Sequence, residues 1–304
     1  MTRWGYRRPV PRGWMFAGVV AAAVVALVLV AAALLRDDAA TSADSAPPPA
    51  FDTSAPPQTK TSSPTPTPPT LDRAKERFFA VAPDALWRAT AGECGKTEPK
   101  VERSTDRGQT WTDVTPHYRD IAQVASLDQI AAHAASMVTE VGADCTPTGM
   151  RTFTDGKFWE PYAGSIDPAR YLSFTDASKV VSPGDDYAAP CPDAHSLRAS
   201  GDLVAVVCDA VADVRVGDDW TALSVSNVAA LGIYRGDLYV AHTGAEGCDG
   251  IAVTRFAGGD AAASADAGCA AHVIKSGQIA IGPSSLGTFV WSGDDVTLAL
   301  PPAR

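Results

Sequence analysis

A turn followed by alternating apolar residues recurs five times in residues 71–304 and limits what the chain can fold into. In each copy an Asp or a Gly supplies the turn, within a Pro-Asp, Leu-Asp, Gly-Asp or Gly-Gln pair. β-Branched or aliphatic residues follow the pair. The apolar positions that mark the five copies are Leu86, Ile130, Leu203, Leu238 and Ile279. These positions lie 44, 73, 35 and 41 residues apart. A repeat of about 40–50 residues with regular turn signals is typical of the four-stranded blades of a β-propeller.

A second motif occurs once in full, at residues 104–111 (STDRGQTW). It has the form S-x-D-x-G-x-x-W, with Ser104, Asp106, Gly108 and Trp111 at the defining positions. The chain here resembles the Asp-box (BNR repeat) β-propeller proteins, which include the sialidase-like family. The resemblance implies a hairpin turn between the third and fourth strands of a blade. In that turn Asp106 would bind backbone amides, Gly108 would take a positive φ and Trp111 would pack in the core.

Weaker copies of the box keep the Gly and, three residues later, an apolar residue at the position of the Trp. This residue is large in every pair except the last. These pairs are Gly156 and Trp159, Gly217 and Trp220, Gly293 and Val296, and the more eroded Gly258 and Ala261. The two motifs alternate along the chain, so we expect an all-β propeller of about five or six degenerate four-stranded blades. The long gap before Leu203 is predicted to hold a sixth blade, with strands near 171–174 and 179–181, or an insertion. A pair of β-sandwiches is the alternative fold.

Residues 121–138 have the composition of a helix, but their place in the repeat predicts strands.

Residues 14–35 contain 22 residues without a charge. At about 1.5 Å per residue, a helix of this length spans roughly 33 Å, enough to cross a bilayer. Arg3, Arg7, Arg8 and Arg12 precede it, so we expect residues 1–13 to form a cytoplasmic tail and the C-terminal domain to lie outside a cell membrane. The alternative is a cleaved signal peptide and a secreted domain.

Residues 36–70 separate the predicted anchor from the predicted propeller. Residues 37–70 contain 9 Pro and 12 Ser or Thr, a composition that predicts a disordered linker. Subtracting the four N-terminal arginines from the 25 basic residues of the chain leaves 21 after residue 35, against 35 acidic residues, a net charge of −14. So acidic a domain is expected to repel nucleic acid and anionic membrane surfaces.

Six cysteines follow the predicted anchor: Cys94, Cys145, Cys191, Cys208, Cys248 and Cys269. An even number in an oxidising compartment predicts three disulfides, for which fifteen pairings are possible. Position in the repeat favours Cys94–Cys145, Cys191–Cys208 and Cys248–Cys269. There is no CxxC, and the five histidines lack zinc-ligand spacing, so we expect no metal and no cofactor.

Catalytic motifs are not evident in the sequence. A sialidase needs an arginine cluster, a Tyr nucleophile with a Glu partner and an acid, and sequence alone assigns none of them. The candidate arginines are Arg88, Arg103, Arg151, Arg170, Arg198, Arg235 and Arg255, and the candidate tyrosines are Tyr162, Tyr171, Tyr234 and Tyr239. The acid pairs 185–186, 218–219 and 294–295 lie close to glycines and are expected to be turn residues.

A non-catalytic, membrane-tethered propeller that binds an envelope protein or a glycan is therefore the function we expect. The alternatives are a sialidase-like glycoside hydrolase and an assembly factor or sensor that acts through its membrane helix.

Overall fold

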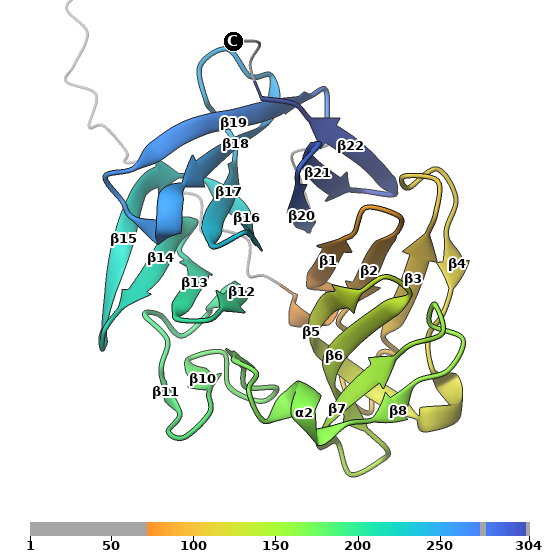
Figure 1. The fold of residues 1–304 in the computed structure, drawn as a ribbon. Helices are drawn as coiled ribbons and strands as arrows, with labels where there is room; N and C mark the ends of the chain where they lie inside the picture. The colour runs from red at the N-terminus through yellow and green to blue at the C-terminus, as the bar shows by residue number, and fades with distance from the viewer. Residues whose placement is uncertain (1–71, 274–277, 302–304) are drawn as a thin grey trace, which may run out of the picture. The chain divides into compact units, whose positions relative to one another are not determined.

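The computed structural model describes residues 72–273 and 278–301, which belong to one compact unit, Thr65–Arg304. Six antiparallel sheets surround a common centre and form a six-bladed β-propeller (Figure 1). The predicted all-β propeller is confirmed, with the larger of the two expected blade numbers. The predicted segments 1–13, 14–35 and 36–70 lie outside the described residues. Within the described residues no helix has the length and apolar character needed to cross a bilayer.

The strands follow one another around the ring in chain order. Blade 1 contains β1 (Arg77–Val81), β2 (Leu86–Thr90), β3 (Lys100–Ser104) and β4 (Thr112–Asp113). Blade 2 contains β5 (Ile121–Ala131), β6 (Ala134–Val141), β7 (Thr146–Thr152) and β8 (Glu160–Pro161). Blade 3 contains β9 (Tyr171–Leu172), β10 (Lys179–Val181) and β11 (Tyr187–Ala188).

Blade 4 contains β12 (His195–Ser200), β13 (Leu203–Cys208), β14 (Val211–Val216) and β15 (Asp219–Ser226). Blade 5 contains β16 (Val228–Tyr234), β17 (Asp237–His242), β18 (Gly250–Phe256) and β19 (Ser264–Ala271). Blade 6 contains β20 (Ile279–Ser284), β21 (Gly287–Ser292) and β22 (Asp295–Ala299). The helices are η1 (Arg73–Lys75), η2 (His117–Arg119), α2 (Ala163–Ile166) and η3 (Ala257–Gly259).

The hydrophobic core is divided into clusters between neighbouring blades. Between blades 1 and 2, for example, the buried rings of Trp87 and Trp159 meet edge to face with centroids 6.0 Å apart. Other clusters lie between blades 3 and 4, 4 and 5, 5 and 6, and 6 and 1. Because both faces of most sheets are covered, inner strands such as β13 are almost continuously apolar.

The sixth blade lies where the sequence predicted it, because β9 and β10 fall within the two expected strand segments. Residues 121–138 form strands β5 and β6, as their place in the repeat predicted. Two of the five repeat positions differ from expectation. Ile130 and Ile279 lie in the first strand of their blades, whereas Leu86, Leu203 and Leu238 lie at the start of the second. In blade 2 the hairpin turn contains His133 at φ +62°, a position that no Gly or Asn marks in the sequence.

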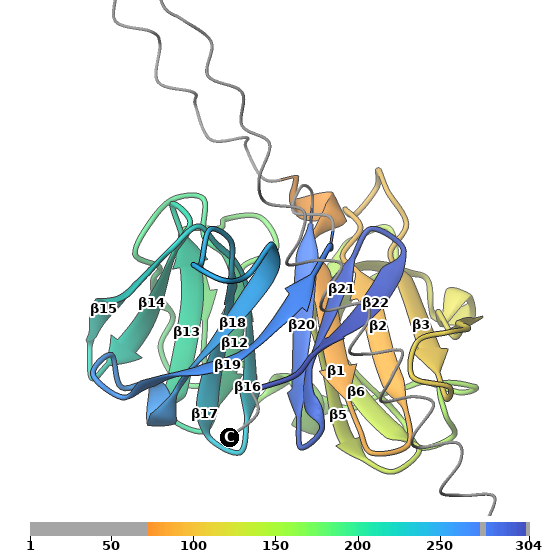
Figure 2. The same cartoon turned by 90° about the horizontal axis from the view of Figure 1, so that it is seen from above.

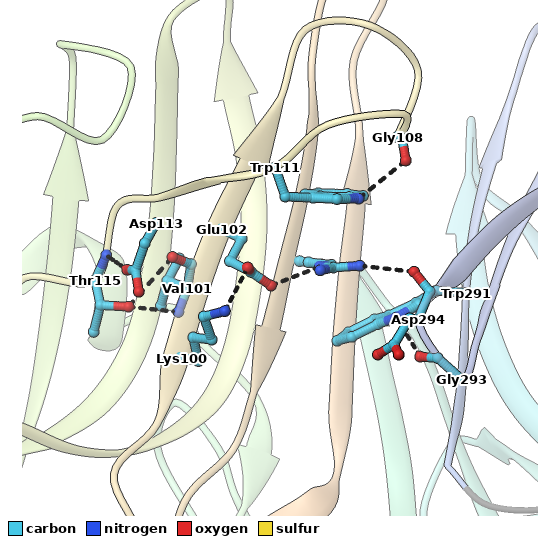
Figure 3. Close-up of polar contacts among 11 residues, drawn as sticks. Lys100, Val101, Glu102, Gly108, Trp111, Asp113, Thr115, Trp291, Gly293 and Asp294 are labelled. Atoms are coloured by element: carbon cyan, nitrogen blue, oxygen red, sulfur yellow. Dashed lines mark hydrogen bonds and ion pairs between the residues drawn. The ribbon is translucent and has the colours of Figure 1, made fainter.

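The ring closes by side-chain packing between blades 6 and 1, which share no strand. The guanidinium of Arg88 lies 4.0 Å from the ring centroid of Trp111 and 4.9 Å from that of Trp291. Arg77 covers the same Trp291 ring at 4.1 Å. Glu102 accepts a hydrogen bond from Arg88 Nε at 2.7 Å and pairs with a lysine of the same strand. Figure 3 shows Trp111 and Trp291 on either side of this network.

The full Asp-box forms the hairpin turn between β3 and β4, the third and fourth strands of blade 1. Ser104 Oγ accepts from Gly108 N at 2.8 Å, and Asp106 Oδ1 accepts from Thr110 N at 2.9 Å. Gly108 has φ +87°. Trp111 is only partly buried: its ring packs against the hydrophobic cluster between blades 6 and 1, with its centroid 6.3 Å from that of Phe79, and also covers Arg88.

The degenerate box at residues 152–159 has the same geometry in blade 2. Thr152 Oγ1 accepts from Gly156 N at 3.1 Å, and Thr154 Oγ1 accepts from Phe158 N at 2.9 Å. Gly156 has φ +83°. A threonine hydroxyl therefore replaces the Asp carboxylate as the acceptor in this turn. Unlike Trp111, Trp159 is fully buried.

The remaining degenerate boxes differ from the first two. Gly217 lies in a short turn between β14 and β15, and Trp220 is partly buried, donating from Nε1 to the Ala188 carbonyl of blade 3 at 3.0 Å. Gly293 lies between the second and third strands of blade 6, not the third and fourth, because that blade has three strands.

Three disulfides join the six cysteines in the pairs that the repeat positions favoured: Cys94–Cys145, Cys191–Cys208 and Cys248–Cys269. The first links the loop after β2 to the loop after β6, so it ties blade 1 to blade 2. The second connects the segment between blades 3 and 4 to the end of β13, and the third lies within blade 5.

Candidate binding cavity at the centre of the ring

A cavity of about 610 Å³ opens at the centre of one face of the propeller. The first strands of five blades, β1, β5, β12, β16 and β20, contribute residues near their C-terminal ends to its wall. We call this side the cavity face. The described domain begins on the opposite side, because η1 directly precedes the N-terminal end of β1 (Figure 2, orange).

Blade 3 contributes to the cavity differently from the other blades. Arg170, just before β9, donates from Nη1 to the Gly201 carbonyl in the β12–β13 turn at 2.8 Å on the cavity face. Ser173, just after β9, accepts from Arg73 of η1 at 2.9 Å on the opposite side. β9 therefore runs against the direction of the other first strands. The segment containing α2 and residues 168–170 lines the cavity where a first strand would otherwise end.

Four arginines line the cavity: Arg151 from β7, Arg170 from the segment before β9, Arg198 from β12 and Arg235 from the turn after β16. In the part of the chain that the structure describes, none of them has a carboxylate within ion-pair distance. This concentration of unpaired positive charge contrasts with the net charge of −14 after residue 35. The centre of an acidic domain is thus locally basic.

Backbone carbonyls and aromatic rings hold these guanidinium groups in place. Arg198 donates to the carbonyls of Leu197 at 2.8 Å and Arg77 at 3.2 Å. Arg151 lies 3.9 Å from the ring centroid of Tyr162, and Arg235 lies 5.2 Å from that of Tyr234. Stacking and carbonyl contacts orient an arginine without neutralising its charge, so the site retains its attraction for an anion.

Asp128 of β5 is the one carboxylate among the residues that line the cavity. Its side chain is reached by water from the cavity, but the surrounding protein raises its pKa by desolvation, and Arg198 opposes that rise. Desolvation likewise lowers the pKa of Arg198, and Glu76 and Asp128 oppose this effect. Glu76 is buried and accepts a hydrogen bond from Ser196 N at 2.8 Å.

Some of the residues considered for catalysis converge on this cavity and others do not. Arg151, Arg170, Arg198, Arg235 and Tyr234 line it. Arg88 and Arg103 belong to contacts between blades, and Arg255 pairs with Asp237 at 2.8 Å. No glutamate is among the lining residues, so within the described chain Tyr234 has no Glu partner in the cavity. The sequence predicted Asp128 as a turn residue of the repeat, but it lies within β5 with its side chain in the cavity wall.

The adjacent acid pairs lie in turns, as expected, away from this wall. Asp186 is in the β10–β11 turn and binds Lys179 at 2.7 Å, and Asp218 is in the β14–β15 turn and binds Arg215 at 3.0 Å. Asp294 lies in the β21–β22 turn, where its carbonyl accepts from Arg88.

One group of potential metal ligands, Cys94, Glu140 and Cys145, has its donor atoms within 4.8 Å of one another. Both cysteines form the first disulfide, so their sulfur atoms are not thiolate ligands. The carboxyl of Glu140 is buried beside this disulfide, and desolvation raises its pKa.

No protein-family model matches the sequence, and no curated protein is significantly similar to it. Similar solved structures include YCF48 bound to D1 peptide (16% identity, TM-score 0.40, covering 74% of this chain and 77% of that one). Another is the SapL1 lectin in complex with alpha methyl fucoside (15% identity, TM-score 0.44, covering 77% of this chain and 99% of that one). A third is an alpha-L-arabinofuranosidase from Clostridium thermocellum (9% identity, TM-score 0.38, covering 71% of this chain and 80% of that one). At these identities and scores the likenesses assign no function to this chain.

Proposed function

We propose that this propeller is a binding module that takes an anionic group of a protein or glycan partner into its central cavity. The observation that carries the proposal is the set of four arginines around a single cavity of about 610 Å³, none of them ion-paired within the described chain. Arginines elsewhere in the domain, such as Arg88 and Arg255, do form ion pairs with carboxylates. The absence of such pairs from the cavity, within the residues that the structure describes, is therefore a local feature of this site.

Physical chemistry supports an anionic ligand for this site. Guanidinium groups bind carboxylates through two parallel N–H···O bonds, and such charge-assisted bonds are stronger than neutral ones. A concave site with low-dielectric walls also concentrates the field of its charges. The acidic remainder of the domain would repel anionic surfaces, so binding would be confined to the cavity.

We further propose that residues 14–35 anchor the chain in a cell membrane and that the propeller acts on the extracytoplasmic side. The uncharged stretch, the preceding arginines and the three disulfides support this location. Protease digestion of intact and permeabilised cells tests it. Digestion of the propeller only after permeabilisation of the cell membrane would contradict it.

The binding proposal is tested by measuring capture of acidic oligosaccharide and acidic peptide arrays by the full chain. We expect ligands from at least one array to bind, and the double variant Arg151→Gln/Arg235→Gln to lose that binding. Arg107→Gln/Lys157→Gln removes two exposed charges outside the cavity and serves as the matched control. Equal binding by the two double variants, or no capture from either array, would overturn the proposal.

A glycoside hydrolase is the second candidate, and the raised pKa of Asp128 inside the cavity is the observation that favours it. Glycosidic bond cleavage uses a general acid whose pKa is raised, but the usual mechanism also requires a second carboxylate. The cavity wall provides only one. A panel of fluorogenic glycosides decides between the candidates: turnover that Asp128→Asn abolishes would establish the hydrolase.

A further inference from the structure

An apolar ledge lies beside the arginine-lined cavity on blade 2. We define it as Ile130, Phe153 and Tyr162, whose exposed fractions are 42%, 65% and 46%. Ile130 itself lines the cavity. Phe153 follows β7 directly, in the β7–β8 hairpin on the cavity face, and Tyr162 follows β8. Large exposed apolar side chains gathered beside a charged cavity are more typical of an interaction surface than of solvated surface.

Arg151 connects the ledge to the cavity. It lines the cavity, and its guanidinium lies 3.9 Å from the ring centroid of Tyr162 and 5.8 Å from that of Phe153. Its Nε is buried and has no hydrogen-bond partner among the described residues. Stacking against the aromatic rings occupies the faces of the guanidinium and leaves its N–H edges for an acceptor. A ligand oxygen would gain affinity from charge-assisted hydrogen bonds with the N–H groups of this guanidinium that remain accessible from the cavity.

We propose that the site recognises an acidic peptide segment in which a carboxylate residue stands next to a large apolar residue. This inference rests on the proposed function and names its ligand class. The carboxylate would enter the cavity and bind Arg151, while the neighbouring apolar side chain would lie against Phe153 and Ile130. The two parts of the ligand match two adjoining surfaces of opposite character.

The ledge favours a peptide over an acidic glycan. A sugar could stack its C–H face on Tyr162, but it would also place hydroxyl groups against the aliphatic side chain of Ile130, where they lose their hydrogen bonds to water. An apolar peptide side chain buries both surfaces without that cost. Peptide segments also offer charged and apolar groups a few ångströms apart along one chain.

The test uses the full chain in detergent and a fluorescein-labelled peptide, Gly-Glu-Leu-Glu-Phe-Gly, with fluorescence polarisation at fixed ionic strength. Two control peptides replace either both Glu by Gln or both apolar residues by Ser. A third probe is labelled trigalacturonate, an acidic glycan. We expect the parent peptide to bind and each control peptide and trigalacturonate to bind at least about tenfold more weakly.

Variants of the protein locate the binding. Arg151→Gln should weaken parent-peptide binding about tenfold, and Phe153→Ser about threefold. Arg107→Gln and Phe158→Ser are the matched controls, because both residues are exposed, lie in hairpins of the cavity face and are not among the residues that line the cavity. They should change the affinity by less than about twofold. Melting temperatures equal to that of the unchanged protein verify folding of each variant.

Several results would overturn the proposal: no binding of the parent peptide, equal binding of the Ser-containing control, or equal effects of Phe153→Ser and Phe158→Ser. Tighter, Arg151-dependent binding of trigalacturonate would also overturn it while leaving the proposed anion-binding function intact. If neither probe binds, the peptide inference fails and the array measurement separately decides the broader function.

Discussion

The guanidinium of Arg88 in blade 1 lies 4.9 Å from the ring centroid of Trp291 in blade 6, and this contact joins the first and last blades of the ring. Trp111 covers Arg88 from the other side, so the tryptophan of the Asp-box supports the ring closure. The Arg88 and Glu102 side chains are each only 11% exposed, which strengthens their ion pair relative to one in open solvent.

Arg88→Gln should destabilise the propeller by about 3 kcal/mol, because it removes two cation–π contacts and one partner of a largely buried ion pair. Urea unfolding monitored by tryptophan fluorescence provides the measurement. Arg107→Gln, an exposed arginine in the adjacent turn, is the control and should change the free energy of unfolding by less than about 0.5 kcal/mol. Equal stabilities of the two variants would show that the contact does not hold the ring together.

The tryptophans of the two equivalent boxes should differ in importance. Trp159→Ala should cost about 3–5 kcal/mol, because the ring is fully buried between blades 1 and 2. Trp111→Ala should cost less, about 2 kcal/mol, since its ring is partly exposed where it packs on the blade 6–1 cluster and on Arg88. The two free energies of unfolding are compared under the same conditions. A larger cost for Trp111 would mean that its packing at the ring closure matters more than its partial exposure indicates.

Asp106 should remain ionised in the folded protein to unusually low pH. Hydrogen bonds from Thr110 and Ser104 lower its pKa from 3.8 to about 2. Because the folded-state pKa is depressed, its contribution to stability is present above the unfolded value and is lost as pH falls from about 4 through about 2. NMR titration of the Asp106 carboxyl carbon measures the pKa directly. Asp106→Asn should remove this part of the pH dependence, and a midpoint near 4 would contradict the assignment.

The first and second disulfides should differ in their contribution to stability. Cys94 and Cys145 are separated by 51 residues, whereas Cys191 and Cys208 are separated by 17. In the chain-entropy account, the longer loop contributes about 1 kcal/mol more. Paired Cys→Ser variants of each disulfide, unfolded in urea, test this. A larger loss for the second disulfide would mean that local packing outweighs loop entropy.

Asp128 should oppose anion binding at neutral pH. Asp128→Asn removes the negative charge from the cavity wall and should tighten binding of an anionic ligand about three- to tenfold. In the unchanged protein the affinity should rise as pH falls through the raised pKa of Asp128, provided that the ligand stays ionised. Isothermal titration calorimetry across pH 4–8 follows both effects. Weaker binding by the Asn variant would indicate that Asp128 accepts a hydrogen bond from the ligand.

The architecture was largely predictable from the sequence because turn chemistry repeats in each blade. Gly108 and Gly156 fix two hairpins with positive φ, and the spacing of the turns indicated the blades. One error occurred where a turn lacks its usual residue. His133 occupies the left-handed region that Gly or Asn normally marks, so Ile130 was assigned to the wrong side of its hairpin.

The cavity was not predictable in the same way. Arg151, Arg170, Arg198 and Arg235 come from a third strand, an interblade segment, a first strand and a turn. Their convergence depends on how blades are arranged around the ring, which no local pattern in the sequence records. The Asp-box likewise located Trp111 in a turn but did not indicate its contact with Arg88, because Arg88 and Trp291 are brought together only by ring closure.

The central claim is that the cavity arginines bind a carboxylate, and the side-chain Nε–H resonances of arginine test it most directly. The full chain, labelled with ¹⁵N and assigned through single Arg→Gln variants, is titrated with glutarate at constant ionic strength. The account predicts that the resonances of Arg151 and Arg235 shift and saturate while that of Arg107 stays in place. Uniform shifts at all three positions, or none at Arg151 and Arg235, would contradict it.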